Sequence, residues 1–465
     1  MSKYEPVSAE VVAALQTALG AEYVKTDAET LDKYKTDEET DPRYHHLPEA
    51  VVWPGSTEEV AAVMKIANRY NVPVTPRSAG TSVSCGAIPV FGGIVLMLER
   101  MDKIIELNTE GMYMVVEAGA RTVEIQEKAN AAGFLYAGDP CSADSCLIGG
   151  NIATNAGGNK AVRYGTTRDQ VYAIEAVTPT GDIVNVGARL KKKSTGYCLE
   201  QLIMGSEGTL GIITKATLKL LPLCPYKLDL LAIFTDLDAA VSLVPNLIKA
   251  GLNPTSVEFM DNGFVRSSSD YCELKLPHYE DGYYVIVTVE TFNEDELESK
   301  MEQLDEICSA SGATDVLEAD ERVWKLRRNC LESTRVLSLV STSDDLVVPV
   351  DQIANCIRHL TKVAENYSFK LFTLAHAGDG NLHFQILKGE MSDEQWEDEV
   401  SRFHAEAYPY VYSLGGRLSG EHGIGAKKVA AMEKYTEPVE MKMMKEIKRA
   451  LDPKNILNPG KVFNA

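Results

Sequence analysis

Two of the eight histidines in the chain flank one short turn, in the stretch HAGDGNLH from His376 to His383. Asp-Gly between short apolar runs is typical of a β-hairpin. With 378–381 as its loop, His376 would lie directly opposite His383. Directly opposed residues share one face of a ladder, with Cβ atoms about 4.5–5.5 Å apart, so their imidazoles could chelate one metal ion. The alternative is a tight turn between two histidines that have ordinary polar partners.

A second stretch, LSGEHGIG, places Glu421 next to His422. Adjacent side chains of a regular strand point to opposite faces, so both could enter one site only on irregular backbone. The flanking glycines, Gly420 and Gly423, permit such backbone. The alternative is a helix start bounded by glycines, with a Glu-His pair on the surface.

Two loops are rich in small residues, PRSAGTS at 76–82 and IGGNIATNAGG at 148–158. Neither is a GxGxxG or GxxxxGK loop, so a Rossmann dinucleotide site or a P-loop NTPase is not indicated. Small residues let backbone N–H groups approach a ligand and bind phosphate oxygens without a net positive charge. The two loops could therefore cradle one pyrophosphate; the alternative is a pair of tight turns.

The composition narrows the classes of partner. A net charge of −21 over 465 residues disfavours nucleic acid and anionic membranes, which need basic patches, but allows a small anionic substrate. No stretch approaches the roughly 20 apolar residues of a membrane span, and the start, MSKYEPVSAE, lacks the features of a signal peptide. The nine cysteines form no CxxC pair, so the usual iron–sulfur and zinc-ribbon spacings are missing. We expect free thiols in a cytoplasmic protein.

The apolar patterns predict two kinds of architecture. Before residue 217, short strands and helices alternate, including a helix that starts at Ser56 with a capping box to Glu59. After about residue 228, two strand–helix–strand units predict an α+β layer, an antiparallel sheet with helices on one face. The expected helices of this later region cover about 236–250, 294–311 and 392–414.

Taken in order, PRSAGTS, IGGNIATNAGG, RYGTTRDQV and TGYCLEQLIMGSEGTLGIIT resemble the FAD-binding domain of the vanillyl-alcohol oxidase superfamily. With HAGDGNLH, SGEHGIG and NPGKVF, the chain is similar to its D-2-hydroxyacid dehydrogenase branch from about residue 45 to 464. The resemblance implies an α+β fold with three parts. They are a two-lobed FAD-binding domain over 1–222, an α+β cap domain with an antiparallel sheet over 223–415, and a C-terminal segment over 416–465 that returns to the FAD site.

The resemblance also implies how FAD is held. The first loop would bind the pyrophosphate, and the second would wrap the flavin and its phosphates. Glu207, Gly211 and Ile212 would meet the adenosine side, and Asn458 would reach the isoalloxazine. No histidine lies between His46 and His278, which closes covalent attachment through the first loop and predicts non-covalent FAD. The predicted FAD contacts are Pro76, Arg77, Ser78, Ala79, Gly80, Thr81, Ser82, Gly149, Gly150, Asn151, Ala153, Thr154, Gly157, Gly158, Glu207, Gly211, Ile212 and Asn458.

For catalysis, the resemblance implies that His376, His383 and Glu421 bind one divalent metal. Zinc, iron and manganese all suit these ligands. His422 would be the general base that takes the substrate hydroxyl proton while the C2 hydride passes to the flavin. Arg327, in WKLRRN, would bind the substrate carboxylate through its planar fork; the alternative is a basic turn on the surface of a helix.

Two departures bear on the substrate. Where 2-hydroxyglutarate enzymes carry Lys and Asn near the distal carboxylate, this chain has Ser343 and Gln385. Their loss favours a small monocarboxylate: D-lactate first, then glycolate or 2-hydroxybutyrate.

The electron acceptor must be a separate molecule. The chain looks most like the lactate dehydrogenase subunit of an electron-confurcating complex with an electron-transferring flavoprotein, linked to NAD and ferredoxin. Alternatives are a dehydrogenase linked to a quinone or cytochrome, a glycolate oxidase subunit with iron–sulfur partners, an oxygen-using oxidase, a non-catalytic FAD relay subunit and a structural metal protein. The sequence leaves open whether two copies of the chain form a homodimer.

Overall fold

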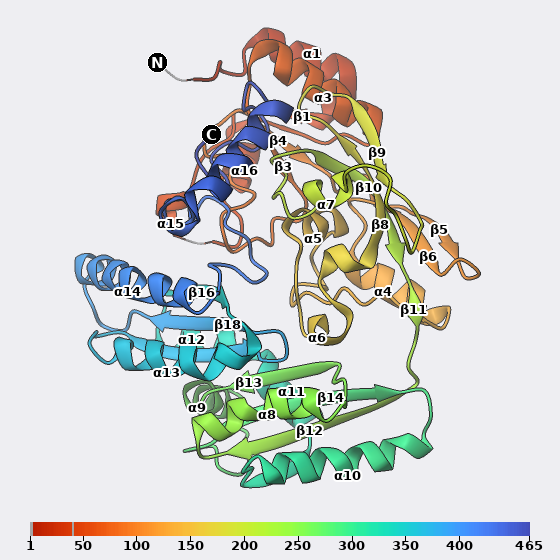
Figure 1. Ribbon diagram of the computed structural model, residues 1–465. Coiled ribbons are helices and arrows are strands. Elements are labelled where there is room, and N and C mark those ends of the chain that lie inside the picture. The colour runs from red at the N-terminus through yellow and green to blue at the C-terminus, as the bar shows by residue number, and fades with distance from the viewer. Residues whose placement is uncertain (1–2, 40) are drawn as a thin grey trace. The chain divides into compact units, whose positions relative to one another are not determined.

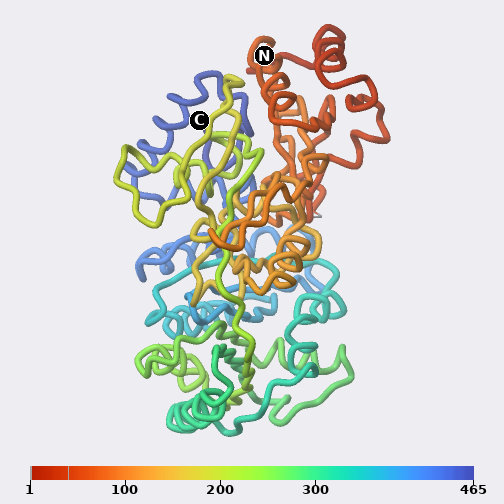
Figure 2. Tube along the Cα trace, turned by 90° about the vertical axis from the view of Figure 1, so that its right-hand side faces the viewer, coloured from red at the N-terminus to blue at the C-terminus, as the bar shows by residue number. Residues whose placement is uncertain are grey.

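A computed structural model of the chain describes residues 3–39 and 41–465 (Figure 1). It divides into two compact units. Unit 1 consists of Met1–Gly157, Gly165–Leu223 and Glu421–Ala465, and unit 2 of Gly158–Tyr164 and Cys224–Gly420. The C-terminal segment, blue in Figure 2, therefore returns to the unit that contains the N-terminus.

The first sheet of unit 1 has a parallel centre. Its strands lie in the order β1 (Val24–Lys25), β2 (Ala50–Val52), β4 (Ile94–Met97) and β3 (Val74–Arg77). β4 runs parallel to both β2 and β3. Every residue of β2 and β4 is buried, which explains why these strands read as continuous apolar runs. Helices α1 (Ala9–Leu19) and α3 (Thr57–Tyr70) pack against each other beside this sheet (Figure 1).

At the start of α3, one of the two hydrogen bonds of the predicted capping box forms as expected. The Ser56 hydroxyl accepts the Glu59 N–H. The Glu59 carboxylate, however, accepts the N–H of Gly55 rather than that of Ser56. The reciprocal bond is therefore displaced by one residue toward the N-terminus, and it still satisfies a backbone donor at the helix start.

The second sheet of unit 1 is antiparallel, in the order β5 (Ile104–Asn108), β6 (Tyr113–Glu117), β10 (Ile212–Lys219), β8 (Val171–Val177) and β9 (Ile183–Gly187). The glycine-rich stretch before β8 is not all loop, because it contains the short helix α5 (Ile148–Thr154). The remaining elements of unit 1 are η1 (Ala21–Tyr23), α2 (Ala28–Lys33), η2 (Pro42–Tyr44), α4 (Thr122–Ala131), β7 (Phe134–Leu135), η3 (Thr167–Gln170), α7 (Leu199–Ile203), β11 (Leu221–Pro222), α15 (Val429–Tyr435) and α16 (Pro438–Leu451).

Unit 2 is built on one seven-stranded sheet in which every neighbouring pair is antiparallel. The expected helices at 236–250, 294–311 and 392–414 are confirmed as α8 (Leu237–Lys249), α10 (Asp295–Ala310) and α14 (Asp393–Ser413). In sheet order the strands are β15 (Asp315–Glu318), β12 (Tyr226–Phe234), β14 (Tyr283–Thr291), β13 (Ser256–Met260), β17 (Lys370–His376), β18 (Asn381–Leu387) and β16 (Ser341–Val347). The helices are α6 (Ala161–Tyr164), α8 (Leu237–Lys249), α9 (Asn262–Tyr271), α10 (Asp295–Ala310), α11 (Glu321–Arg328), α12 (Cys330–Leu337), η4 (Val350–Gln352), α13 (Ile353–Ala364) and α14 (Asp393–Ser413).

Helices cover both faces of this sheet, and the expectation of helices on one face is wrong. On one face, Leu231 and Ile233 of β12 pack with residues of α9, α11 and α12. The alternate residues Ala232 and Phe234 are also buried, and α8 and α10 contact β12. The run LDLLAIF is apolar at nearly every position, as expected of a strand that is buried on both sides.

The histidine hairpin forms, but with a different register from the predicted one. His376 pairs with Asn381 and Leu374 pairs with His383, so the four-residue loop is 377–380. The two histidines are diagonal neighbours rather than directly opposed. They still share one face of the sheet, because the displacement along the strand is two residues, the period of side-chain alternation.

All nine cysteines are free thiols, as expected. Across residues 3–39 and 41–465, the helices are each too short or too polar to cross a membrane.

Asp261 is a half-buried helix cap whose ionisation should be visible in stability. Its carboxylate accepts the N–H groups of Phe264, at the start of α9, and Thr373 of β17. Burial raises the pKa of Asp261 to about 7, although these hydrogen bonds oppose the shift. The folded protein then holds a proton that the unfolded chain releases near 3.8, so this group lowers the free energy of unfolding as pH rises between those two values.

We therefore expect Asp261→Asn to flatten the decrease in unfolding free energy between about pH 4 and about pH 7. Denaturant titrations at several pH values measure it. The control is Asp236→Asn, at the exposed cap of α8, which should leave the wild-type pH dependence unchanged. An Asp261→Asn curve parallel to that of the wild type would contradict the assignment.

Candidate active site

The two glycine-rich segments of unit 1 meet at very short range. A Cβ atom added at Gly150, in the first turn of α5, would lie 3.2 Å from Cβ of Ser78 in the first loop. One added at Gly149 would lie 2.7 Å from Cβ of Ala118, and the Gly149 N–H donates to the Ala118 carbonyl at 2.8 Å. The absence of side chains at both glycines is therefore what lets PRSAGTS and IGGN approach as two sides of one backbone cradle.

Arg77, the last residue of β3, supports the rest of the first loop with its side chain. Its guanidinium is buried and donates to the Thr36 carbonyl at 2.6 Å. Gly80 has φ +81°, and a Cβ atom there would lie 2.1 Å from Nη2 of Arg77. A residue other than glycine at position 80 would thus meet both backbone strain and the guanidinium. In the same loop, the Ser82 hydroxyl accepts the Gly86 N–H at 3.1 Å.

Glu207 and Asn458 join the C-terminal segment to α5. The Glu207 N–H donates to the Ala153 carbonyl at 2.8 Å, and Nδ2 of Asn458 donates to the Glu207 carbonyl at 2.7 Å. The Asn458 N–H in turn donates to the Val74 carbonyl of β3. Oδ1 of Asn458 is buried and has no hydrogen-bond partner among the described residues. Such an acceptor suits a ligand N–H group, as the flavin ring offers.

The Glu207 carboxylate is engaged elsewhere. It accepts the N–H groups of Ile424 and Gly425 at 2.7 Å each. Burial raises the pKa of Glu207, and these two hydrogen bonds oppose the shift. Both donors follow His422 in the chain, so this carboxylate is bonded to the loop that carries the candidate base, and its predicted contact with adenosine stays a prediction.

The other predicted FAD residues lie as follows. Gly157 lies against Glu421, since a Cβ atom on it would lie 2.7 Å from a Glu421 carboxylate oxygen. Gly211 precedes Ile212, the first residue of β10. Gly158, one residue past Gly157, begins the short segment that belongs to unit 2. The predicted FAD residues not yet placed all belong to unit 1: Pro76, Ala79, Thr81, Asn151 and Thr154.

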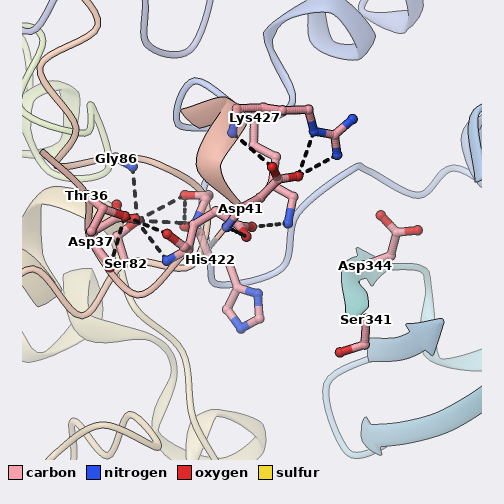
Figure 3. Close-up of polar contacts among 12 residues, drawn as sticks. Thr36, Asp37, Asp41, Ser82, Gly86, Ser341, Asp344, His422 and Lys427 are labelled. Carbon is pink, nitrogen blue, oxygen red and sulfur yellow. Dashed lines mark hydrogen bonds and ion pairs between the residues drawn. The ribbon is translucent and has the colours of Figure 1, made fainter. Parts of the chain in front are cut away.

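The stretch after Gly420 has irregular backbone, as the flanking glycines predicted. Gly423 and Gly425 have φ of +83° and +53°, and the next helix, α15, begins only at Val429. The Ser84 hydroxyl donates to the His422 carbonyl at 2.9 Å. Figure 3 labels His422 together with Ser82, the last residue of the first loop, and Gly86, which lie on either side of Ser84 in the chain. The His422 side chain is half-buried, with Nε2 at 3.7 Å from Oε1 of Glu421.

In unit 2, the two hairpin histidines are buried and close together. Their ring centroids are 5.2 Å apart and the ring planes are nearly perpendicular, at 89°. Nδ1 of His376 contacts Oε1 of Glu258 at 2.8 Å. Oε2 of Glu258 accepts Nε and Nη2 of Arg327 at 3.0 and 2.5 Å. Burial acts to raise the pKa of Glu258, but His376 and Arg327 outweigh it and bring it down to about 2.

Asp345 of β16 lies on the same face of the sheet. It pairs across the strands with His383, and its Oδ1 accepts Nδ2 of Asn381 at 2.6 Å. Its Oδ2 accepts the Ser419 hydroxyl at 2.6 Å and the Gly420 N–H at 3.1 Å. Asp345 therefore fixes the last residues of unit 2, immediately before Glu421 and His422 in the chain.

The two residues that depart from the 2-hydroxyglutarate pattern are cross-strand partners. Ser343 pairs with Gln385, two residues along from the pairing of Asp345 with His383. Nε2 of Gln385 donates to the Ser341 hydroxyl at 2.8 Å. Both positions are uncharged and lie on the face that carries the histidines.

Sequence reasoning overlooked three residues that bond to predicted site residues or to the loop beside them: Glu258 and Asp345 within unit 2, and Ser84 within unit 1. A signal existed for Glu258, which interrupts the apolar part of the strand SVEFM and is fully buried. A carboxylate at such a position needs a compensating partner. No comparable local signal marks Ser84 or Asp345, because their partners come from distant parts of the chain.

Comparisons with known proteins show the family to which the chain belongs. Residues 227–462 match the family model of the C-terminal domain of FAD-linked oxidases, and residues 48–187 match that of an FAD-binding domain. The chain is 36% identical over 425 residues to a D-lactate dehydrogenase of Anaerostipes hadrus, covering 89% of each protein. It is 35% identical over 427 residues to glycolate oxidase subunit GlcD of Bacillus subtilis (strain 168), covering 91% of this chain and 90% of that protein.

The fold recurs in solved structures of low sequence identity. That of p-cresol methylhydroxylase aligns with a TM-score of 0.81 at 18% identity, covering 97% of this chain and 96% of that one. The 4-ethylphenol oxidase of Gulosibacter chungangensis aligns with a TM-score of 0.78 at 20% identity, covering 99% and 98%. The predicted vanillyl-alcohol oxidase-type architecture is confirmed. This chain belongs to the FAD-linked oxidases and is an FAD-dependent oxidoreductase.

Proposed function

We propose that the protein is a dehydrogenase that oxidises a small D-2-hydroxy acid, D-lactate before others, to the 2-oxo acid. The observation that carries the proposal is the polar face of the unit 2 sheet, where two buried imidazoles lie 5.2 Å apart and one of them contacts Glu258, the partner of Arg327. The identity to a D-lactate dehydrogenase over most of the chain supports the same substrate class.

Unit 1 would bind FAD non-covalently through the backbone cradle of PRSAGTS and IGGN and through Asn458. The close approach of Gly150 to Ser78 and the buried Oδ1 of Asn458 fit that cofactor. When bound, FAD supplies the hydride acceptor. The protein supplies the position of the substrate and the group that takes its proton.

His376, His383 and Glu421 would hold one divalent metal: zinc, iron or manganese. The hydrogen bond from Nδ1 of His376 to Glu258 fixes the ring so that Nε2 is the ligating nitrogen, the usual arrangement for a metal-bound histidine. A divalent ion there would lower the pKa of the substrate hydroxyl.

His422 would take the hydroxyl proton as general base. Arg327 would bind the substrate carboxylate, with Glu258 orienting its guanidinium through Nε and Nη2. The uncharged pair Ser343 and Gln385 supports a substrate without a distal carboxylate.

Electrons would leave through a separate carrier, for which we propose an electron-transferring flavoprotein, in a cytoplasmic complex linked to NAD and ferredoxin. A second candidate is glycolate oxidation with an iron–sulfur or quinone partner. The identity to glycolate oxidase subunit GlcD favours that candidate specifically.

Anaerobic flavin reduction tests the substrate class directly. We expect D-lactate to bleach the visible flavin absorbance quickly and glycolate more slowly. L-lactate and D-2-hydroxyglutarate should bleach it least. For D-2-hydroxyglutarate the reason is that Ser343 and Gln385 offer no charged side chain to bind its distal carboxylate. Removal of metal with a chelator should abolish the reaction, and adding back zinc, iron or manganese should restore it. Bleaching only by D-2-hydroxyglutarate would overturn the substrate assignment, and no bleaching by any acid would favour a relay subunit.

His422→Asn should leave FAD bound but slow flavin reduction by D-lactate by roughly 10²–10⁴-fold, the range for loss of a general base. Stopped-flow absorbance measures the rate. His359→Asn is the matched control, since His359 lies on α13 and its ring stacks on that of Tyr410 of α14, with centroids 3.7 Å apart. A near-normal rate in His422→Asn would remove it from the role of base.

His376→Ala should lower the metal content of the purified protein as well as its activity, because one of three ligands is lost. Elemental analysis reports the metal independently of turnover. His278→Ala, at a half-buried histidine beside Asp281, should keep the wild-type content. Full metal occupancy in His376→Ala would refute the ligand assignment.

A further inference from the structure

We propose that Glu207 is a positioning residue of the active site, whose carboxylate sets the backbone of the loop that carries His422. The proposal rests on the proposed role of His422 as general base. Oε1 and Oε2 of Glu207 each accept one backbone N–H, from Ile424 and Gly425, both at 2.7 Å. A carboxylate that accepts two short N–H bonds in a buried place is a strong and directional anchor.

The loop is shaped around this carboxylate. Gly423 has φ +83°, and a Cβ atom there would lie 2.9 Å from Oε1 of Glu207. Gly425 has φ +53°, and a Cβ atom there would lie 1.8 Å from the Ser84 carbonyl oxygen. The residues after His422 are therefore confined between Glu207 and the Ser84 backbone, and the glycines permit the close approach.

A second contact holds the loop at His422 itself, whose carbonyl accepts the Ser84 hydroxyl at 2.9 Å. Glu207 is in turn fixed by its own backbone, with φ +53° and with its N–H on the Ala153 carbonyl of α5. Asn458 donates to its carbonyl. Glu207 thus links α5, the helix of the FAD cradle, to the loop that carries His422, and both lie within unit 1.

The test is Glu207→Gln, which keeps the size of the side chain but replaces one acceptor oxygen by an amide that faces an N–H donor. We expect flavin reduction at saturating D-lactate to slow by about 10–100-fold, since small misplacement of a catalytic group costs on that order. The FAD content, the melting temperature and the KM should stay close to those of the wild type. Glu200→Gln is the matched control, a similarly buried carboxylate paired with Lys193, and should react at the wild-type rate.

The decisive measurement repeats Glu207→Gln in the His422→Asn background. If Glu207 acts through His422, its effect there should shrink to less than about 2-fold, because residues that act as a unit are not additive. Ser84→Ala, which loosens the same loop from its other side, should also slow the reaction and also lose its effect in that background. These two variants keep the test decisive if one of them folds poorly.

Three outcomes would overturn the proposal in distinguishable ways. If the double variant slows flavin reduction by the product of the two single factors, Glu207 acts independently of the base, while His422 keeps its role. Loss of FAD from Glu207→Gln, with a normal rate restored by excess FAD, would make it a cofactor contact. A normal rate in His422→Asn alone would remove the base assignment itself, and with it the reason to position that loop.

Discussion

A buried carboxylate is unfavourable unless charges or hydrogen bonds compensate it, and this constraint organises the candidate site residues within each unit. Glu258, Asp345 and Glu207 are all buried. Each is compensated by groups from another part of the chain: α11 and the hairpin for Glu258, the hairpin and Ser419 for Asp345, and the loop that carries His422 for Glu207. Because the alternative is an uncompensated charge, these contacts hold distant segments in place.

The period of two along a β-strand then distributes the chemistry within unit 2. His376, His383 and Asp345 share one face of the sheet with Glu258, while Asp344, the neighbour of Asp345, points to the other face and binds His404 and Tyr408 of α14. Of these two adjacent aspartates, Asp345 therefore faces the hairpin histidines and Asp344 bonds to the helix α14. An odd shift of register in β16 would exchange the two roles.

Local patterns predicted the elements well and the packing less well. The helices at α8, α10 and α14 followed from their apolar period, and the family motifs led to the FAD-binding architecture. The predicted loop of the hairpin was one residue too far toward the C-terminus, because the stretch around Gly-Asp-Gly-Asn allows more than one four-residue turn. Coverage of the sheet on both faces was also missed, although the uninterrupted apolar run of β12 indicates it.

By itself, the sequence determined the residue types, their order and the family, because histidine pairs, glycine loops and turn motifs are encoded over a few neighbouring positions. Only the tertiary structure decided which groups those residues bind. Glu258 reaches His376 across 118 residues of chain, and Glu207 reaches Ile424 across 217. Such pairings depend on sheet register and on backbone conformations that bring remote segments together, and no local pattern specifies them.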